Sequence, residues 1–261
     1  MISLLLLLTF TIQCIIIIHS FHITSHTRRY SLTSHLSSTS KPTVTTSSFD
    51  DSNASSQFGT KTYWDDMYSG MGDFSSEEYS WYFGWADIKS YFVNYAPQPL
   101  KKQKDDSSIR IMEPKVLVPG IGNDGILLDL YNYGFKDITA FDYSQSAIDR
   151  QVDLLSYNTQ ALDDIQLLVR DARTLDKEWT DEFDLVFEKG ALDAIYLSGQ
   201  GFVNMAVVEL SRVIKSGGIF MSVSGVVPEE LRRELFPVDQ WEWIRDGSLD
   251  LKAGCFVLRR K

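Results

Sequence analysis

"VLVPGIGNDGILLDLYNYGFKDITAFDYS" runs from Val116 to Ser144. Its first apolar run predicts a buried strand, the periodic apolar residues that follow predict a helix, and its last apolar run predicts a second strand. After the first strand, Gly120, Gly122 and Gly125 spell G-x-G-x-x-G, and Asp142 lies 22 residues beyond the first glycine. This pattern is typical of a βαβ unit that binds an adenosine-containing ligand, with the acid on the ribose hydroxyls. The glycines alone leave the ligand open.

Strands and helices go on alternating beyond this unit. Strands are predicted at 115–119, 137–142, 165–169, 183–187 and 219–223, with helices at 123–133, 145–157 and 202–214. Upstream, a short helix around 63–68 and a second over 80–96 are expected. Such alternation predicts an α/β fold with a parallel sheet wrapped on both faces by helices. Two β-rich runs at 240–244 and 253–259 predict a C-terminal antiparallel pair, which completes seven strands.

Charge narrows the range of partners. The formal net charge of the 261 residues is −10, and the first 49 residues contain no Asp or Glu, so the negative charge is concentrated in the rest of the chain. An acidic surface repels phosphate backbones, which argues against nucleic acid as a direct partner. A basic protein that offers a lysine would be attracted instead.

Two residue types are almost missing from the folded part. All four histidines lie before residue 36, and the two cysteines are Cys14 and Cys255. A domain without histidine cannot form a Ser-His-Asp or Cys-His triad, and it offers no Cys/His zinc site, so no metal is expected. The single cysteine left excludes an internal disulfide.

The first 58 residues have targeting character. Residues 1–20 contain the apolar run "LLLLLTFTIQCIIII", which resembles a signal-peptide core and is too short for a stable membrane span in the mature protein. Residues 21–58 are rich in Ser and Thr and are predicted to be a disordered transit or linker segment. Together the two segments resemble the two-part plastid presequences of algae whose plastid came from another alga; mitochondrion and secretory pathway are the alternatives. The domain is predicted over 60–261.

Two acids favour a ligand that lacks a pyrophosphate. Asp124 stands at the predicted helix start, where its charge would repel a phosphate that a helix N-terminus should attract. Asp171 ends the third predicted strand, where a carboxylate can accept a hydrogen bond from the exocyclic amine of adenine.

Five motifs in order carry a family resemblance. They are "YWDDMYSG" (63–70), "SWYFGWADIKSYF" (80–92), the opening stretch, "FDLVFEKGALDAI" (183–195) and "ELSRVIKSGGIFMSV" (209–223). Together they resemble class I S-adenosylmethionine-dependent methyltransferases with a Rossmann-like seven-stranded fold. More narrowly, they look like the eukaryotic subfamily that includes lysine methyltransferases of elongation factor 1-alpha and citrate synthase.

The resemblance implies a set of positions that bind S-adenosyl-L-methionine. Aromatic residues would cover its methionine end, the first two glycines would be the functional pair of the loop, Asp142 would hold the ribose, Asp171 and Ala172 would border the adenine, and Lys189 would sit at the mouth. The full set is Trp64, Tyr68, Trp81, Gly120, Gly122, Asp142, Tyr143, Asp171, Ala172 and Lys189.

The chain departs from the family pattern at several places. Pro119 and Ile121 replace the usual residues of the glycine loop. Many class I enzymes have an acid where Val118 stands, to hold the amino group of the cofactor; the subfamily lacks it too, so another group must do that here. The ending "AGCFVLRRK" replaces the usual C-terminal strand of the subfamily, which puts the substrate in doubt more than the cofactor.

The implied reaction is an in-line displacement at the methyl group, in which the enzyme chiefly holds the nucleophile, methyl carbon and sulfur in line. A lysine acceptor must be neutral, although its free pKa is about 10.4. Glu188, Asp193 and Tyr196 are the catalytic candidates near the mouth. The alternatives are a small-molecule methyltransferase, a non-catalytic methyltransferase-like binding module and a nicotinamide (NAD) dehydrogenase.

Overall fold

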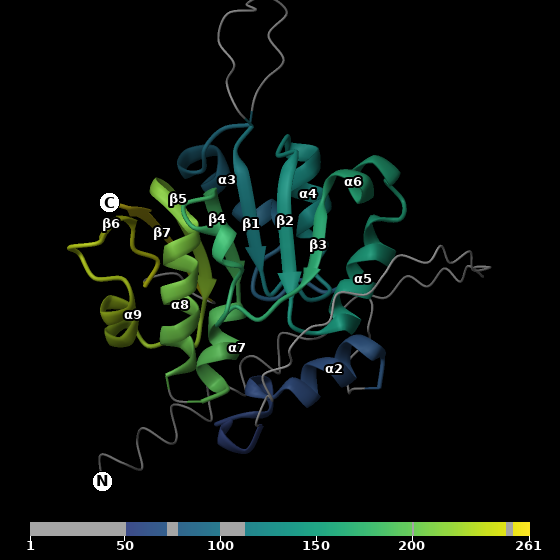
Figure 1. Ribbon diagram of the computed structural model, residues 1–261, viewed down its shortest axis with the longest axis horizontal. Coiled ribbons are helices and arrows are strands. Elements are labelled where there is room, and N and C mark those ends of the chain that lie inside the picture. The colour runs from purple at the N-terminus through teal and green to yellow at the C-terminus, as the bar shows by residue number, and fades with distance from the viewer. Residues whose placement is uncertain (1–50, 72–77, 100–112, 200, 249–252) are drawn as a thin grey trace, which may run out of the picture. The chain divides into compact units, whose positions relative to one another are not determined.

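The computed structural model describes residues 51–71, 78–99, 113–199, 201–248 and 253–261 (Figure 1). The predicted signal-like segment and all but the end of the 21–58 segment lie outside these residues. Within the described ranges, no helix is long and apolar enough to cross a membrane.

One seven-stranded sheet organises these residues. Its strand order is β3-β2-β1-β4-β5-β7-β6. Strands β1 to β5 run parallel, β7 pairs antiparallel with β5, and β6 pairs antiparallel with β7. The bounds are β1 Lys115–Pro119, β2 Asp137–Asp142, β3 Gln166–Val169, β4 Phe183–Lys189, β5 Ile214–Ser224, β6 Trp241–Arg245 and β7 Gly254–Arg260. The predicted fold class is therefore confirmed.

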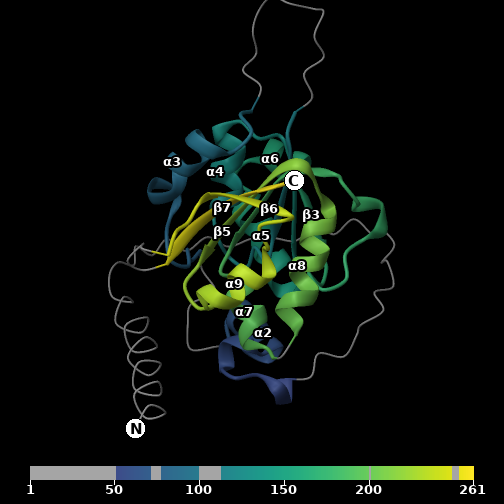
Figure 2. The same ribbon diagram turned by 90° about the vertical axis from the view of Figure 1, so that its left-hand side faces the viewer.

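Helices cover both faces of the sheet (Figures 1 and 2). The bounds are α2 Lys61–Ser69, α3 Trp85–Tyr95, α4 Ile126–Tyr133, α5 Gln145–Leu155, α6 Thr159–Asp164, α7 Ala191–Leu197, α8 Phe202–Val213 and α9 Glu229–Leu235. Successive side chains of a strand point to opposite faces of the sheet, so a separate hydrophobic core forms on each face. Val116 and Val118 of β1 pack in the cluster beneath α3 and α4, and Leu117 packs in the cluster beneath α8.

Helix boundaries differ from the prediction in one important place. The helix predicted from residue 80 begins only at Trp85, because Tyr82 has a left-handed backbone with φ +64°. Gly84 precedes the helix, and the Asp87 carboxylate accepts from the Gly84 N–H at 3.1 Å, which caps the first turn. Residues 79–83 therefore form an irregular segment before the helix.

Shorter differences occur elsewhere. The helices α6, α7 and α9 were not predicted, and each has only six or seven residues. Strand β5 begins at Ile214, so the helix predicted over 202–214 ends one residue early. None of these changes the sheet order. The carboxyl ends of the five parallel strands meet at one edge, where ligands bind in open α/β sheets.

Candidate functional site

The loop after β1 has the backbone that only glycine adopts easily. Gly120 and Gly122 have φ +61° and +56°, in the left-handed region. A Cβ on Gly120 would lie 2.6 Å from the Cβ of Ala191, and one on Gly122 would lie 2.6 Å from the Tyr68 hydroxyl. Gly125 has an ordinary φ of −73°. The first two glycines therefore form the tight turn, or cradle, of this loop.

Asp142 ends β2 and turns into this cradle. Its side-chain oxygens accept from the N–H groups of Gly122 and Ser144, both at 3.0 Å, and the residue is 2% exposed. Burial raises the pKa of Asp142 to about 6, against the lowering effect of the two N–H donors. The group is thus an ionised acceptor at neutral and higher pH, as a ribose contact requires.

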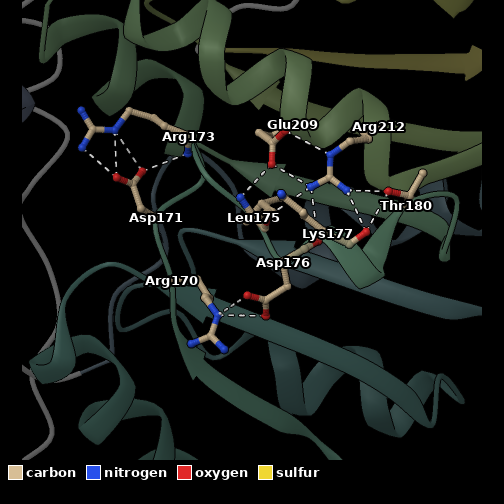
Figure 3. A network of polar contacts seen from close by, with 9 residues as sticks. All are labelled: Arg170, Asp171, Arg173, Leu175, Asp176, Lys177, Thr180, Glu209 and Arg212. Carbon is tan, nitrogen blue, oxygen red and sulfur yellow. Dashed lines mark hydrogen bonds and ion pairs between the residues drawn. The ribbon is translucent and has the colours of Figure 1, made fainter. Parts of the chain in front are cut away.

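Asp171 follows β3 and lies in a network of charged side chains (Figure 3). Its carboxylate accepts from the Arg173 guanidinium through Nε at 3.0 Å and Nη2 at 2.7 Å, and from the Arg173 backbone N–H at 2.9 Å. The Arg173 guanidinium in turn lies over the Phe202 ring, 4.6 Å from its centroid. Ala172 is buried beside it. Asp171 is therefore a fixed acceptor in a folded loop.

The predicted aromatic residues come together around α2. Trp64 and Tyr68 stack with centroids 5.8 Å apart, and Trp81 meets Trp64 edge to face at 5.5 Å. Tyr143 packs against the same cluster. Burial raises the pKa of Tyr68 well above its usual value, which keeps the phenol neutral. The cluster lies beside the glycine loop, because a Cβ added to Gly122 would meet the Tyr68 hydroxyl.

Lys189, the last residue of β4, forms a buried ion pair with Asp124. The two side chains are only 5% and 7% exposed. Lys189 Nζ also donates to the Trp81 carbonyl oxygen at 2.7 Å, and Asp124 Oδ1 accepts from Ser80 Oγ at 3.2 Å and from Ile126 N at 3.0 Å. From the sequence, Asp124 is expected only to repel a phosphate. Its place in the pair depends on the contact between the β1 and β4 loops, which the motif spacing does not reveal.

Two catalytic candidates lie in a buried polar cluster next to the mouth. Glu188 has no exposed surface, and its carboxylate accepts hydrogen bonds from Ser222 Oγ and from Leu192 N. Burial, together with the charge of Asp193, raises the pKa of Glu188 to about 7. Asp193 accepts from the Tyr82 hydroxyl at 2.6 Å and from Ser224 Oγ at 2.5 Å. It also accepts from the backbone N–H groups of residues 225–227.

The third candidate, Tyr196, lies on α7 and is half-buried against the cluster beneath α8. The sequence reasoning missed Arg232 of α9, which is 2% exposed and completes the polar cluster. Its Nη2 donates to Ser224 Oγ at 2.5 Å. For an arginine on such a short helix, the local sequence gives no signal that the side chain is buried in a polar cluster.

Comparisons with known proteins identify the family of this chain. The family model described as "Methyltransferase domain" matches residues 115–246, half of the chain. The chain belongs to this methyltransferase family. It is accordingly a methyltransferase, and its cofactor is S-adenosylmethionine.

Several relatives are similar in sequence. A mouse protein named EEF1A lysine methyltransferase 4 is 26% identical over 197 residues, which cover 72% of this chain and 69% of the relative. The human EEF1A lysine methyltransferase 2 is 34% identical over 127 residues, which cover 47% of this chain and 52% of the relative. A Drosophila melanogaster protein named eEF1A lysine and N-terminal methyltransferase homolog is 24% identical over 64% of this chain, which spans only 22% of that relative.

Solved structures share the fold of the methyltransferase. A protein described under "Conversion of a Disulfide Bond into a Thioacetal Group during Echinomycin Biosynthesis" gives a TM-score of 0.57 at 17% identity, covering 77% of this chain and 93% of the other. The [4+2]-cyclase SpnF gives 0.51 at 14% identity, covering 74% and 76%. At these identities, the similarity concerns the fold alone.

At the carboxyl edge of the sheet, the site residues lie in the same order as the parts of S-adenosylmethionine: adenine, ribose and amino-acid end. Asp171, Asp142, the glycine loop and Lys189 follow β3, β2, β1 and β4, which are neighbours in the sheet. Three strand spacings cover about 14 Å. When bound, the cofactor supplies a methyl group on a sulfonium. Asp171 would hold the adenine amine, Asp142 the ribose hydroxyls, and the Asp124–Lys189 pair the charged amino-acid end, for which Val118 offers no acid.

Proposed function

We propose that the methyltransferase transfers the methyl group of S-adenosylmethionine to the side-chain amine of a lysine in a protein. The observation that carries the proposal is the similarity to relatives named as lysine methyltransferases of EEF1A, one of them matched over 72% of this chain. The net charge of −10 supports a basic protein surface as the acceptor. Elongation factor 1-alpha is therefore the first acceptor to test.

The acceptor lysine must reach the methyl carbon as a neutral amine. Moving the amine from water into the site lowers its pKa, and a nearby carboxylate can orient it and take the proton. Glu188 and Asp193 remain the candidates for that role, and the Tyr82 hydroxyl donates to Asp193. Asp193 already accepts from five donors, whereas the pKa of about 7 for Glu188 suits proton transfer near neutral pH.

A label-transfer assay tests the acceptor class. The protein is incubated with S-adenosylmethionine labelled in its methyl group and with purified elongation factor 1-alpha, a protein extract, or the small-molecule fraction of the same cells. Label in a protein band, recovered as methyl-lysine after hydrolysis, is the expected result. Label confined to the small-molecule fraction would identify a small-molecule methyltransferase and refute the proposal. Heat-denatured enzyme is the control for non-enzymatic transfer.

A further inference from the structure

The loop between β3 and β4, which carries Asp171, is fastened to α8 by one ion pair. Glu209 and Arg212 lie three residues apart on α8, at the edge of its buried face. Arg212 Nε and Nη2 donate to the Glu209 carboxylate at 3.1 and 2.7 Å, and the two side chains are partly buried. Figure 3 shows both side chains turned toward the loop.

Both members of the pair bind the backbone of the loop. Glu209 Oε2 accepts from the Leu175 N–H at 2.8 Å. Arg212 Nη2 donates to the carbonyl oxygens of Leu175 at 3.2 Å and Asp176 at 3.3 Å, and its Nη1 donates to Thr180 Oγ1 at 2.8 Å. The backbone groups of a loop need hydrogen-bond partners, and here α8 supplies those of Leu175 N–H and of the Leu175 and Asp176 carbonyl oxygens. Because the guanidinium is a planar fork, it fixes the direction as well as the distance of these contacts.

The fastened residues connect directly to the nucleoside contacts. The Asp176 carboxylate accepts from Arg170 Nε at 3.1 Å, and the Arg170 backbone N–H donates to the Asp142 carbonyl oxygen at 2.9 Å. On the other side, the Thr174 N–H donates to the Asp171 carbonyl oxygen at 3.0 Å. The path from α8 therefore reaches the backbone of both residues assigned to the adenosine, Asp171 at the adenine amine and Asp142 at the ribose.

We propose that Glu209 and Arg212 are positioning residues for adenine recognition, which set the place of the Asp171 carboxylate through the β3–β4 loop. Neither residue touches the cofactor in this scheme. A displacement of about 1 Å at a contact of this kind is enough to weaken it strongly. The inference rests on S-adenosylmethionine as the cofactor and is independent of which acceptor the enzyme methylates.

The test compares two ligands that differ only at the base. S-adenosylhomocysteine has the 6-amino group that Asp171 accepts from, and S-inosylhomocysteine has a 6-oxo group in its place. Calorimetric titration should show that the wild-type protein prefers the adenine ligand by about tenfold. In Arg212→Gln, the affinity for S-adenosylhomocysteine should fall by about tenfold with little change for S-inosylhomocysteine, so that the preference is lost. An equal loss for both ligands, or no loss, would overturn the proposal.

Three further variants keep the test decisive. Glu209→Gln keeps the shape of the side chain and should show the same loss of preference for the adenine ligand. It provides the test if Arg212→Gln does not fold. Asp171→Ala should abolish the preference; if it does not, the assignment of Asp171 to adenine fails, and the proposal fails with it while the label-transfer result stands. Arg259→Gln removes an exposed ion pair with Glu242 on β6 and should change neither affinity.

Discussion

Replacing Asp142 by alanine will lower the affinity for S-adenosylmethionine by at least about 100-fold. The carboxylate is assigned to both ribose hydroxyls, and hydrogen bonds to a charged group contribute about 1.5–3 kcal/mol each. Two such bonds correspond to a factor of about 100 or more. Calorimetric titration at pH 8 measures the change, because the pKa of about 6 keeps Asp142 ionised there. Lowering the pH of the wild-type protein through 6 should weaken binding as well, since a protonated carboxyl loses acceptor capacity.

The matched control for this variant is Asp137→Ala. Asp137 is the first residue of the same strand, exposed at the opposite edge of the sheet, and its removal should leave cofactor affinity within about twofold. Circular dichroism and a thermal melt establish that both variants are folded. Retention of wild-type affinity in folded Asp142→Ala would refute the assignment of the ribose site.

Replacing Arg232 by methionine is expected to lower the free energy of unfolding by about 3–5 kcal/mol. The guanidinium is 2% exposed, lies 3.9 Å from the centroid of the Phe256 ring, and donates to Ser224 Oγ and the Val227 carbonyl oxygen. Methionine keeps much of the volume but leaves the buried carboxylates Glu188 and Asp193 without their cation. Urea denaturation followed by fluorescence measures the loss.

The neighbouring Arg233 provides the control for that effect. It stands on the same helix, is about 40% exposed, and pairs with Asp246 and Glu229 at the surface. Arg233→Met should lower the free energy of unfolding by less than about 1 kcal/mol. Adding Glu188→Gln to Arg232→Met should restore part of the stability, because it removes one of the buried negative charges. If Arg232→Met and Arg233→Met lowered the free energy of unfolding equally, the charge of Arg232 would not be what stabilises the buried cluster.

Much of the fold could be predicted because its signals are local. The apolar runs of β1 and β2, and the helical period between them, lie in one continuous stretch, and the same alternation recurs down to β5. The short helices α6, α7 and α9 offer too few periodic positions to be recognised. The start of α3 was misplaced because the φ of +64° at Tyr82 depends on tertiary contacts, among them the hydroxyl bond to Asp193, 111 residues away.

The site also contains residues that local sequence predicts and residues that only the tertiary structure brings together. Gly120, Gly122, Asp142 and Asp171 stand at strand ends, so strand boundaries and motif spacing are sufficient to propose them. The Asp124–Lys189 pair, the Arg232 cluster and the contact between α8 and the β3–β4 loop join residues from separate segments. Their positions follow from the strand order β3-β2-β1-β4-β5, which places adjacent loops together and which no local pattern encodes.

A crystal structure of the protein with S-adenosylhomocysteine tests the assigned cofactor site most directly. We expect the ribose hydroxyls within hydrogen-bonding distance of the Asp142 carboxylate, the adenine amine at Asp171, and the amino-acid end at Asp124 and Lys189. A nucleoside bound away from Asp142, or one lying across the edge in the reverse direction with its amino-acid end at Asp171, would contradict this assignment.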